Sequence, residues 1–234
     1  MESLPVYVSI VFMLTTLVAV VFLLFAVRDA GASTLPAQIF LFVIPLWAAL
    51  QALLASDEYA YHNFSSVPPR MVQTGVLPAL LFILIYFIFF RSSFIERLSL
   101  RKLTLLHVVR IPVELCLLWL YIGGQVPQVM TFEGRNFDIL SGILAPVVYL
   151  IAFRGGTVKR WLLIVYNVLG LILLANIVSI AIMALPSPMQ SIAFDQPNRG
   201  VLYFPYIWLP TILVPMVLFS HLAALWKLAK SQTA

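Results

Sequence analysis

Residues 4–27 read LPVYVSIVFMLTTLVAVVFLLFAV, a run of 24 residues without one charged side chain. A helix needs about 20 apolar residues to cross the hydrocarbon core of a bilayer. The run is too long for the apolar part of a signal peptide, and Glu2 stands where such a peptide carries basic residues. We therefore predict an uncleaved transmembrane helix at the start of the chain.

Six further stretches of the same kind follow. Together they predict seven transmembrane helices, at approximately 4–27, 35–54, 72–90, 104–122, 137–153, 161–184 and 201–225. They occupy most of the 234 residues, so we expect an all-α integral membrane protein with a single seven-helix domain over 1–234. The composition agrees, because 62% of the residues are hydrophobic and 10% are charged, against about 45–50% and about 25% in soluble domains.

The basic residues are distributed unequally between the two sets of loops. With the N-terminus outside, the inner segments hold ten of the 14 lysines and arginines, the outer loops hold three, and the fourth span holds one. Cytoplasmic loops retain Lys and Arg during insertion, so the bias predicts an N-out, C-in orientation. The pI of about 9.5 then reflects topology and contact with anionic membrane lipid, not binding to nucleic acid. The minimal loops favour a bacterial inner membrane.

One side of the predicted helix 104–122 is polar. His107, Arg110, Glu114 and Tyr121 fall within about 60° of one another on a helical wheel. Ionisable side chains inside a bilayer are costly and usually serve a site. We predict an intramembrane ligand or proton site, with Glu114 as the titratable group and Arg110, one turn away, as its partner. A structural ion pair that fixes the helix register is the alternative.

His107 and His221 are expected at comparable depth, because the helix 104–122 runs outward and the helix 201–225 runs back. Two histidines on separate helices can ligate a haem, and this stays open as a minor alternative. They make a poor metal site on their own, since two ligands are too few. The sequence therefore predicts no cofactor and no metal.

The outer loops carry further polar chemistry. Arg135 and Arg199 are predicted outer contacts for a lipid phosphate or an anionic ligand, because guanidinium groups suit such oxygens. Asp138 or Asn136 is expected to cap the helix 137–153. A calcium site is a weaker alternative, because its carboxylates show no compact spacing; its candidates are Asp57, Glu58, His62, Glu133, Asp138 and Asp195.

Prolines and asparagines mark two further features of the spans. Pro205, Pro210 and Pro215 predict a kinked last helix, because each removes a backbone donor. Asn167 and Asn176 lie on opposite faces of the helix 161–184, and we expect each to hydrogen-bond a neighbouring helix.

No known family of seven-span proteins accounts for these motifs. The last span lacks the central lysine that retinal proteins require, and it lacks the H-x-x-x-H of zinc-dependent intramembrane hydrolases. We expect binding or transport of a small amphipathic, lipid-like or anionic ligand, and we lean away from an enzyme. An intramembrane enzyme, a haem-binding membrane protein and a structural subunit of a membrane complex remain the alternatives.

Overall fold

A computed structural model describes residues 4–56, 61, 64–156 and 158–230, and every regular element in these ranges is helical. Apart from four short 3-10 helices in the connections, at Ile95–Arg97, Gln128–Met130, Arg154–Gly156 and Gly200–Leu202, the described elements form seven helical rods. Two begin with a π-helical turn, and one contains a 3-10 turn, His107–Val109. In chain order they are α1 (Val6–Asp29), α2 (Leu35–Ser56), the π turn Val72–Val76 with α3 (Leu77–Phe89), α4 (Leu100–Leu106) with α5 (Arg110–Ile122), α6 (Asp138–Ala152), α7 (Arg160–Met183), and the π turn Leu209–Leu213 with α8 (Val214–Lys230).

Six of these rods are long and apolar enough to cross a membrane, and α6 is apolar but shorter, with 15 residues. Each predicted span therefore coincides with one rod, and the helical class is confirmed. The last span differs from the prediction, because regular helix begins at Leu209 and not near 201, and it continues to Lys230. Pro205 and Pro210 explain the late start, since both lack the donor that an earlier helix would need.

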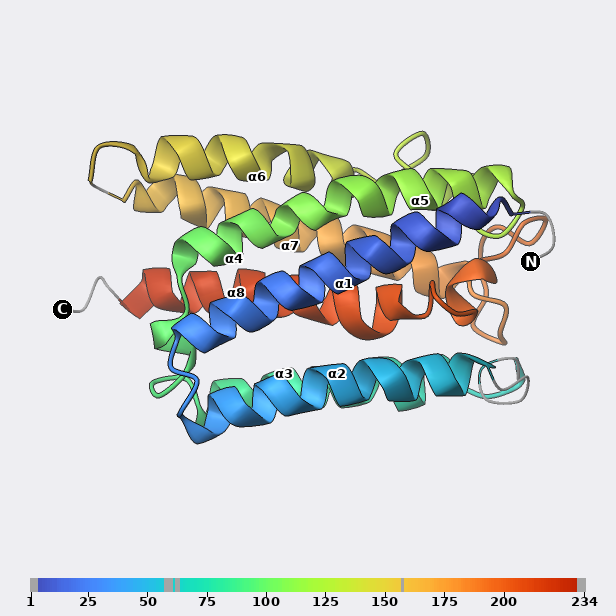
Figure 1. The fold of residues 1–234 in the computed structure, drawn as a ribbon. Coiled ribbons are helices and arrows are strands. Elements are labelled where there is room, and N and C mark those ends of the chain that lie inside the picture. The colour runs from blue at the N-terminus through green and yellow to red at the C-terminus, as the bar shows by residue number, and fades with distance from the viewer. Residues whose placement is uncertain (1–3, 57–60, 62–63, 157, 231–234) are drawn as a thin grey trace.

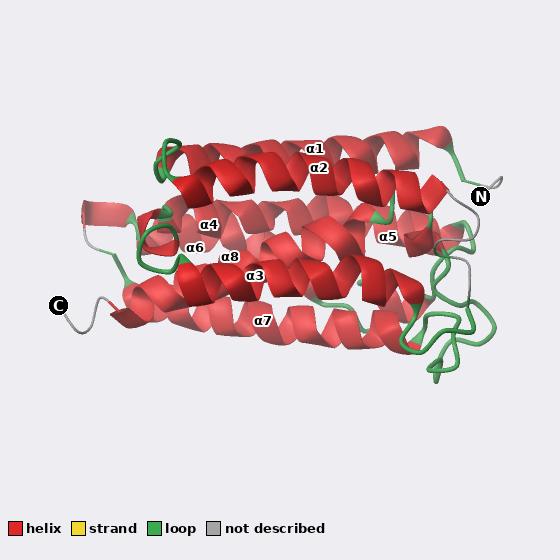
Figure 2. Cartoon of the chain, turned by 90° about the horizontal axis from the view of Figure 1, so that it is seen from below, coloured by secondary structure: helices red, strands yellow, loops and turns green. Residues whose placement is uncertain are grey.

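The rods run side by side along one long axis (Figure 1), and α8 is the central one. Within an 18-residue apolar stretch of the α8 rod, 61% is buried inside the protein. The corresponding share is 17% for the α2 and α3 rods, which lie together on one flank. The pair α6 and α7 covers the opposite flank. The segments 123–137 and 184–208 gather at the end where α1 begins (Figure 2), whereas α8 ends at the other end.

Side chains of α2 complete the backbone hydrogen bonding of its two proline-containing neighbours. Pro215 removes the donor that would ordinarily bond the carbonyl of Thr211, and Trp47 Nε1 donates to that oxygen at 3.0 Å. Gln51, one turn further along α2, donates at 3.3 Å to the carbonyl that Pro78 leaves without its usual donor. The Trp47 bond therefore joins α2 to the π turn before α8, and the Gln51 bond joins α2 to the π turn before α3.

Candidate functional site

A connected set of polar side chains is buried where α5, α6, α7 and α8 meet. Each member has at most 7% of its surface exposed, although all lie among apolar helices. Charged groups this deeply buried are costly unless they are paired. We call this set the polar network, and it consists of His107, Arg110, Glu114, Asn136, Asp138, Asn167 and His221.

Arg110 is the centre of the polar network. Its Nη1 donates to Asp138 Oδ1 at 2.9 Å, which forms a buried ion pair between α5 and α6. Its Nη2 lies 3.3 Å from His221 Nε2 on α8. Among the described residues no ion pair joins Arg110 to Glu114, so the predicted pairing along one helix is wrong. The long arginine side chain instead reaches across to the first residue of the neighbouring helix.

The hydrogen bonds of His221 determine its tautomer. A guanidinium only donates, so His221 Nε2 must accept from Arg110, and His221 Nδ1 carries the proton. Nδ1 then donates to Asn167 Oδ1 at 2.8 Å, and Asn167 Nδ2 donates to the carbonyl of Leu163 at 2.7 Å. His221 is therefore held as a neutral ring between α5 and α7. The expected bond of Asn167 to another helix is confirmed.

Glu114 joins the polar network through an amide and not through a cation. Asn136 Nδ2 donates to Glu114 Oε1 at 2.6 Å, while Asn136 Oδ1 accepts the backbone N–H of Asp138 at 3.1 Å. The N-cap of α6 is Phe137, so neither predicted residue is the cap. Asn136 accepts the first backbone N–H of α6 from one residue before the cap, and Asp138 is engaged with Arg110. Glu114 Oε2 is buried and has no hydrogen-bond partner.

Glu114 lines two cavities. A cavity of about 100 Å³ is lined by Glu114 and Asp138, with largely apolar walls that include Leu117 and Ile177. A smaller one of about 30 Å³ is lined by Arg110 and both carboxylates, and this volume is large enough to hold water. Both carboxylates therefore line the two cavities, and the guanidinium-bearing Arg110 lines the smaller one.

His107 completes the polar network by ring contact alone. Its ring stacks on that of His221, with centroids 3.8 Å apart and planes 13° from parallel, and it meets Tyr166 edge-on at 5.8 Å. Neither nitrogen of His107 has a hydrogen-bond partner. No porphyrin fits between rings at this spacing, so the geometry gives the haem alternative no support. The residues that the structure describes also contain no group of three or more metal-ligating side chains.

Close packing around the polar network depends on Gly170 of α7. A β-carbon added there would stand 2.3 Å from His221 Cε1. A side chain at this position is therefore incompatible with the present place of the histidine ring. Sequence reasoning missed this role, since one glycine in an apolar helix carries no signal of its own.

The other predicted site residues lie outside the polar network. Tyr121 is partly exposed near the end of α5. Its carbonyl accepts from Gln196 Nε2 at 3.0 Å and from the backbone N–H of Gly124 at 2.9 Å. Arg135 and Arg199 are exposed in the long loops, and neither guanidinium has a hydrogen bond or ion pair with the described residues. Their predicted contact with an anion is untested.

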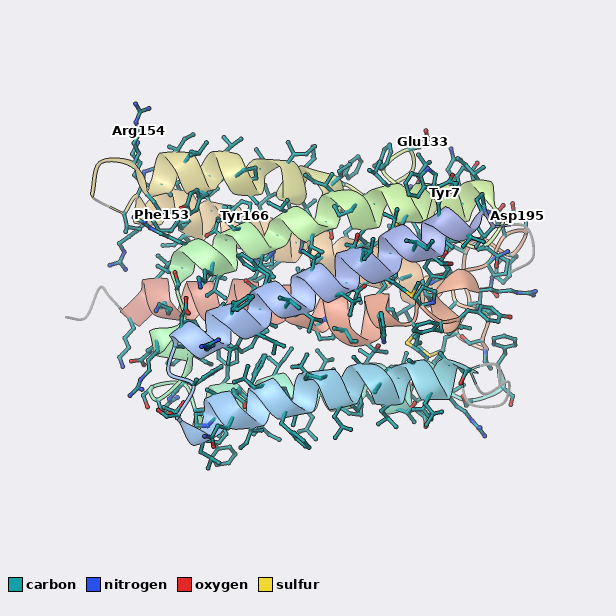
Figure 3. All side chains as sticks on the ribbon, in the orientation of Figure 1. Tyr7, Glu133, Phe153, Arg154, Tyr166 and Asp195 are labelled. Atoms are coloured by element: carbon teal, nitrogen blue, oxygen red, sulfur yellow. The ribbon has the colours of Figure 1, made fainter. Side chains whose placement is uncertain are left out.

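The calcium alternative gains no support from the residues that can be placed. Asp57, Glu58 and His62 lie outside the described residues. Glu133 and Asp195 project from separate loops (Figure 3), and Asp138 is paired with Arg110. These last three carboxylates therefore do not converge on one cation.

The fold and the polar network define a class: an all-helical protein whose helices can cross a membrane several times around a buried charged interior. Residues 68–229 match the family described as "Domain of unknown function (DUF8737)", and the chain belongs to that family. The match includes the whole polar network, and the description names no activity. Comparison with curated proteins and with solved structures gave no match.

Proposed function

We propose that the chain crosses the cell membrane seven times, N-out and C-in, in a bacterial inner membrane. The distribution of basic residues supports this orientation, because the end of the bundle at which α8 terminates carries ten lysines and arginines and the opposite end carries three. The shorter α6 is counted as a span because it packs against both α5 and α7. At 1.5 Å per residue its 15 residues extend about 22 Å.

We further propose that the polar network binds or transports a small amphipathic ligand, and that the charge it accepts is positive. The observation that carries this proposal is a charge imbalance: two buried carboxylates, Glu114 and Asp138, share the single guanidinium of Arg110. An unpaired buried charge is strongly unfavourable. The polar network is neutral only when it holds one more positive charge, which a proton on Glu114 or a bound cationic group supplies.

The cavity beside Glu114 supports the amphipathic character of the ligand. Its walls are mainly apolar side chains, and the two carboxylates form its charged part. Asp138 already neutralises Arg110, so the polar network has no unpaired cation for an anionic ligand. We therefore favour a protonated or cationic ligand over the anionic one.

Paired probes of similar shape and opposite charge test this proposal. Purified protein in proteoliposomes would be supplied with radiolabelled benzylammonium or benzoate. We expect uptake of benzylammonium and not of benzoate, and loss of uptake in Glu114→Gln. The matched control is Glu133→Gln, which removes a carboxylate from an exposed loop. Preference for benzoate would refute the sign of the charge.

An infrared measurement tests the proton separately from transport. A protonated carboxyl group gives a C=O stretching band distinct from that of a carboxylate. We expect this band in the wild-type protein at neutral pH, and its absence in Glu114→Gln. If the protein takes up no benzylammonium and shows no such band, and the Glu114→Gln variant is fully folded, the alternative of a structural subunit remains.

A further inference from the structure

Another pocket, separate from the two cavities beside Glu114, lies at the opposite end of α6 from the polar network. It has a volume of about 500 Å³ and is lined by Arg101 of α4, Arg154 and Lys159 of the α6–α7 turn, and the rings of Tyr149 and Phe153. No acidic side chain lines it. Three cations therefore converge on one pocket without a protein anion to neutralise them.

The three cations are available to a ligand, unlike others at the same end of the bundle. Lys102 is paired with Asp29, and Lys230 with Glu96. Within the described part of the chain, the side chains of the three pocket cations have no hydrogen bond or ion pair with protein. The Arg101 Cζ atom lies 5.3 Å from the Phe153 ring centroid, a cation–π contact that positions the guanidinium and leaves its N–H groups free.

The turn after α6 explains how Arg154 and Lys159 reach the same pocket. Gly155 has a φ of +79°, a conformation that favours glycine, and it reverses the chain directly after Arg154. The backbone N–H of Lys159 then donates to the carbonyl of Ala152 at 2.9 Å, which closes the turn. Figure 3 shows Arg154 projecting beyond the end of α6, above Phe153.

The neighbouring surface of α6 is suited to acyl chains. Leu150, Val147 and Ile143 are 66%, 45% and 48% exposed and follow one another along the helix toward its other end. With about 22 Å of length, α6 falls short of the roughly 30 Å hydrocarbon core. A short span is accommodated by local thinning of the bilayer and by flanking basic side chains that extend to the interface, and both bring the cations at its end to the lipid phosphates. The pocket and this apolar surface are continuous along α6.

We propose that the Arg101–Arg154–Lys159 pocket binds a phosphate group, and that its source is an anionic phospholipid whose acyl chains lie along α6. Arginine and lysine donate to phosphate oxygens in charge-assisted bonds, and aromatic rings favour the interfacial depth. A soluble phosphate compound offers the same chemistry without the acyl chains. The proposal concerns a site separate from the polar network and does not depend on the ligand bound there.

The test is native mass spectrometry of the full-length protein in mild detergent, titrated with phosphatidylglycerol, phosphatidylcholine or inorganic phosphate. The test variant is Arg101→Gln/Lys159→Gln. The control is Arg28→Gln/Arg97→Gln, which removes two exposed cations from the same end outside the pocket. At about 1 kcal/mol for each cation, the test variant should bind phosphatidylglycerol roughly thirtyfold more weakly, and the control should change little.

Each outcome decides the proposal. Selective phosphatidylglycerol adducts that only the pocket variant loses support a lipid site. A second outcome is that inorganic phosphate adducts are lost in the pocket variant while phosphatidylglycerol shows no selective binding. This outcome supports the phosphate site and overturns its lipid source. Equal binding by wild type and both variants overturns the proposal. Circular dichroism of both variants checks that they fold, and Lys159→Arg should retain binding.

Discussion

Replacing Asp138 by asparagine tests whether the Arg110–Asp138 pair is the electrostatic centre of the polar network. The change keeps the shape of the side chain and removes the charge that faces the guanidinium at 2.9 Å. Arg110 is 3% exposed, so bulk solvent does not reach the guanidinium. Stranding one member of a buried ion pair typically costs about 3–5 kcal/mol.

Glu114 modifies this expectation in a way that can be measured. Its carboxylate can ionise and partly compensate Arg110 when Asp138 is gone, so we expect about 3 kcal/mol for Asp138→Asn alone. Glu114→Gln alone should cost about 1 kcal/mol or less, because a glutamine oxygen can still accept from Asn136. The double variant should lose about 5 kcal/mol, more than the sum, because no carboxylate then remains near the guanidinium.

Equilibrium unfolding in mixed micelles, followed by circular dichroism, supplies the free energies for this double-mutant cycle. Asp138→Glu serves as a control that restores the charge one methylene further away and should recover part of the stability. The reasoning is refuted if Glu114→Gln is as destabilising as Asp138→Asn, or if the two losses simply add. The first result would mean that Glu114 is the true partner of Arg110. The second would mean that the two carboxylates act independently.

The remaining predictions concern packing, the α2 flank and the exposed end of the bundle. Gly170→Ala should destabilise the protein by about 1–3 kcal/mol, because its β-carbon would displace the ring of His221; unfolding in micelles measures this. Trp47→Phe should cost about 1–3 kcal/mol in the same assay by stranding the carbonyl of Thr211. A hydrogen bond from Lys230 of α8 holds the pKa of Glu96 below its ordinary 4.5. Acidification below pH 4.5 should therefore remove the stability that this bond provides, and Glu96→Gln should abolish that pH dependence.

The helical class and most span boundaries follow from the sequence, because the physical requirement is local. A run of about 20 apolar residues has to be helical to satisfy its backbone in lipid, whatever its neighbours are. The run at 4–27 and the one at 161–184 each coincide with a rod to within two residues. The last span was placed too early because hydropathy does not mark where a helix begins, whereas Pro205 and Pro210 delay the regular helix to Leu209.

Only part of the candidate site could be predicted from the sequence. Spacing on one helix brings Arg110, Glu114 and His107 to one side, and all three belong to the polar network. Spacing cannot show which of two carboxylates the guanidinium reaches, because Asp138 is 28 residues away and adjacent only through the packing of α6 on α5. Local periodicity therefore determined the helices and the polar side of α5. The tertiary structure decided the partners, since hydrogen bonds and ion pairs act over about 3 Å in space regardless of separation along the chain.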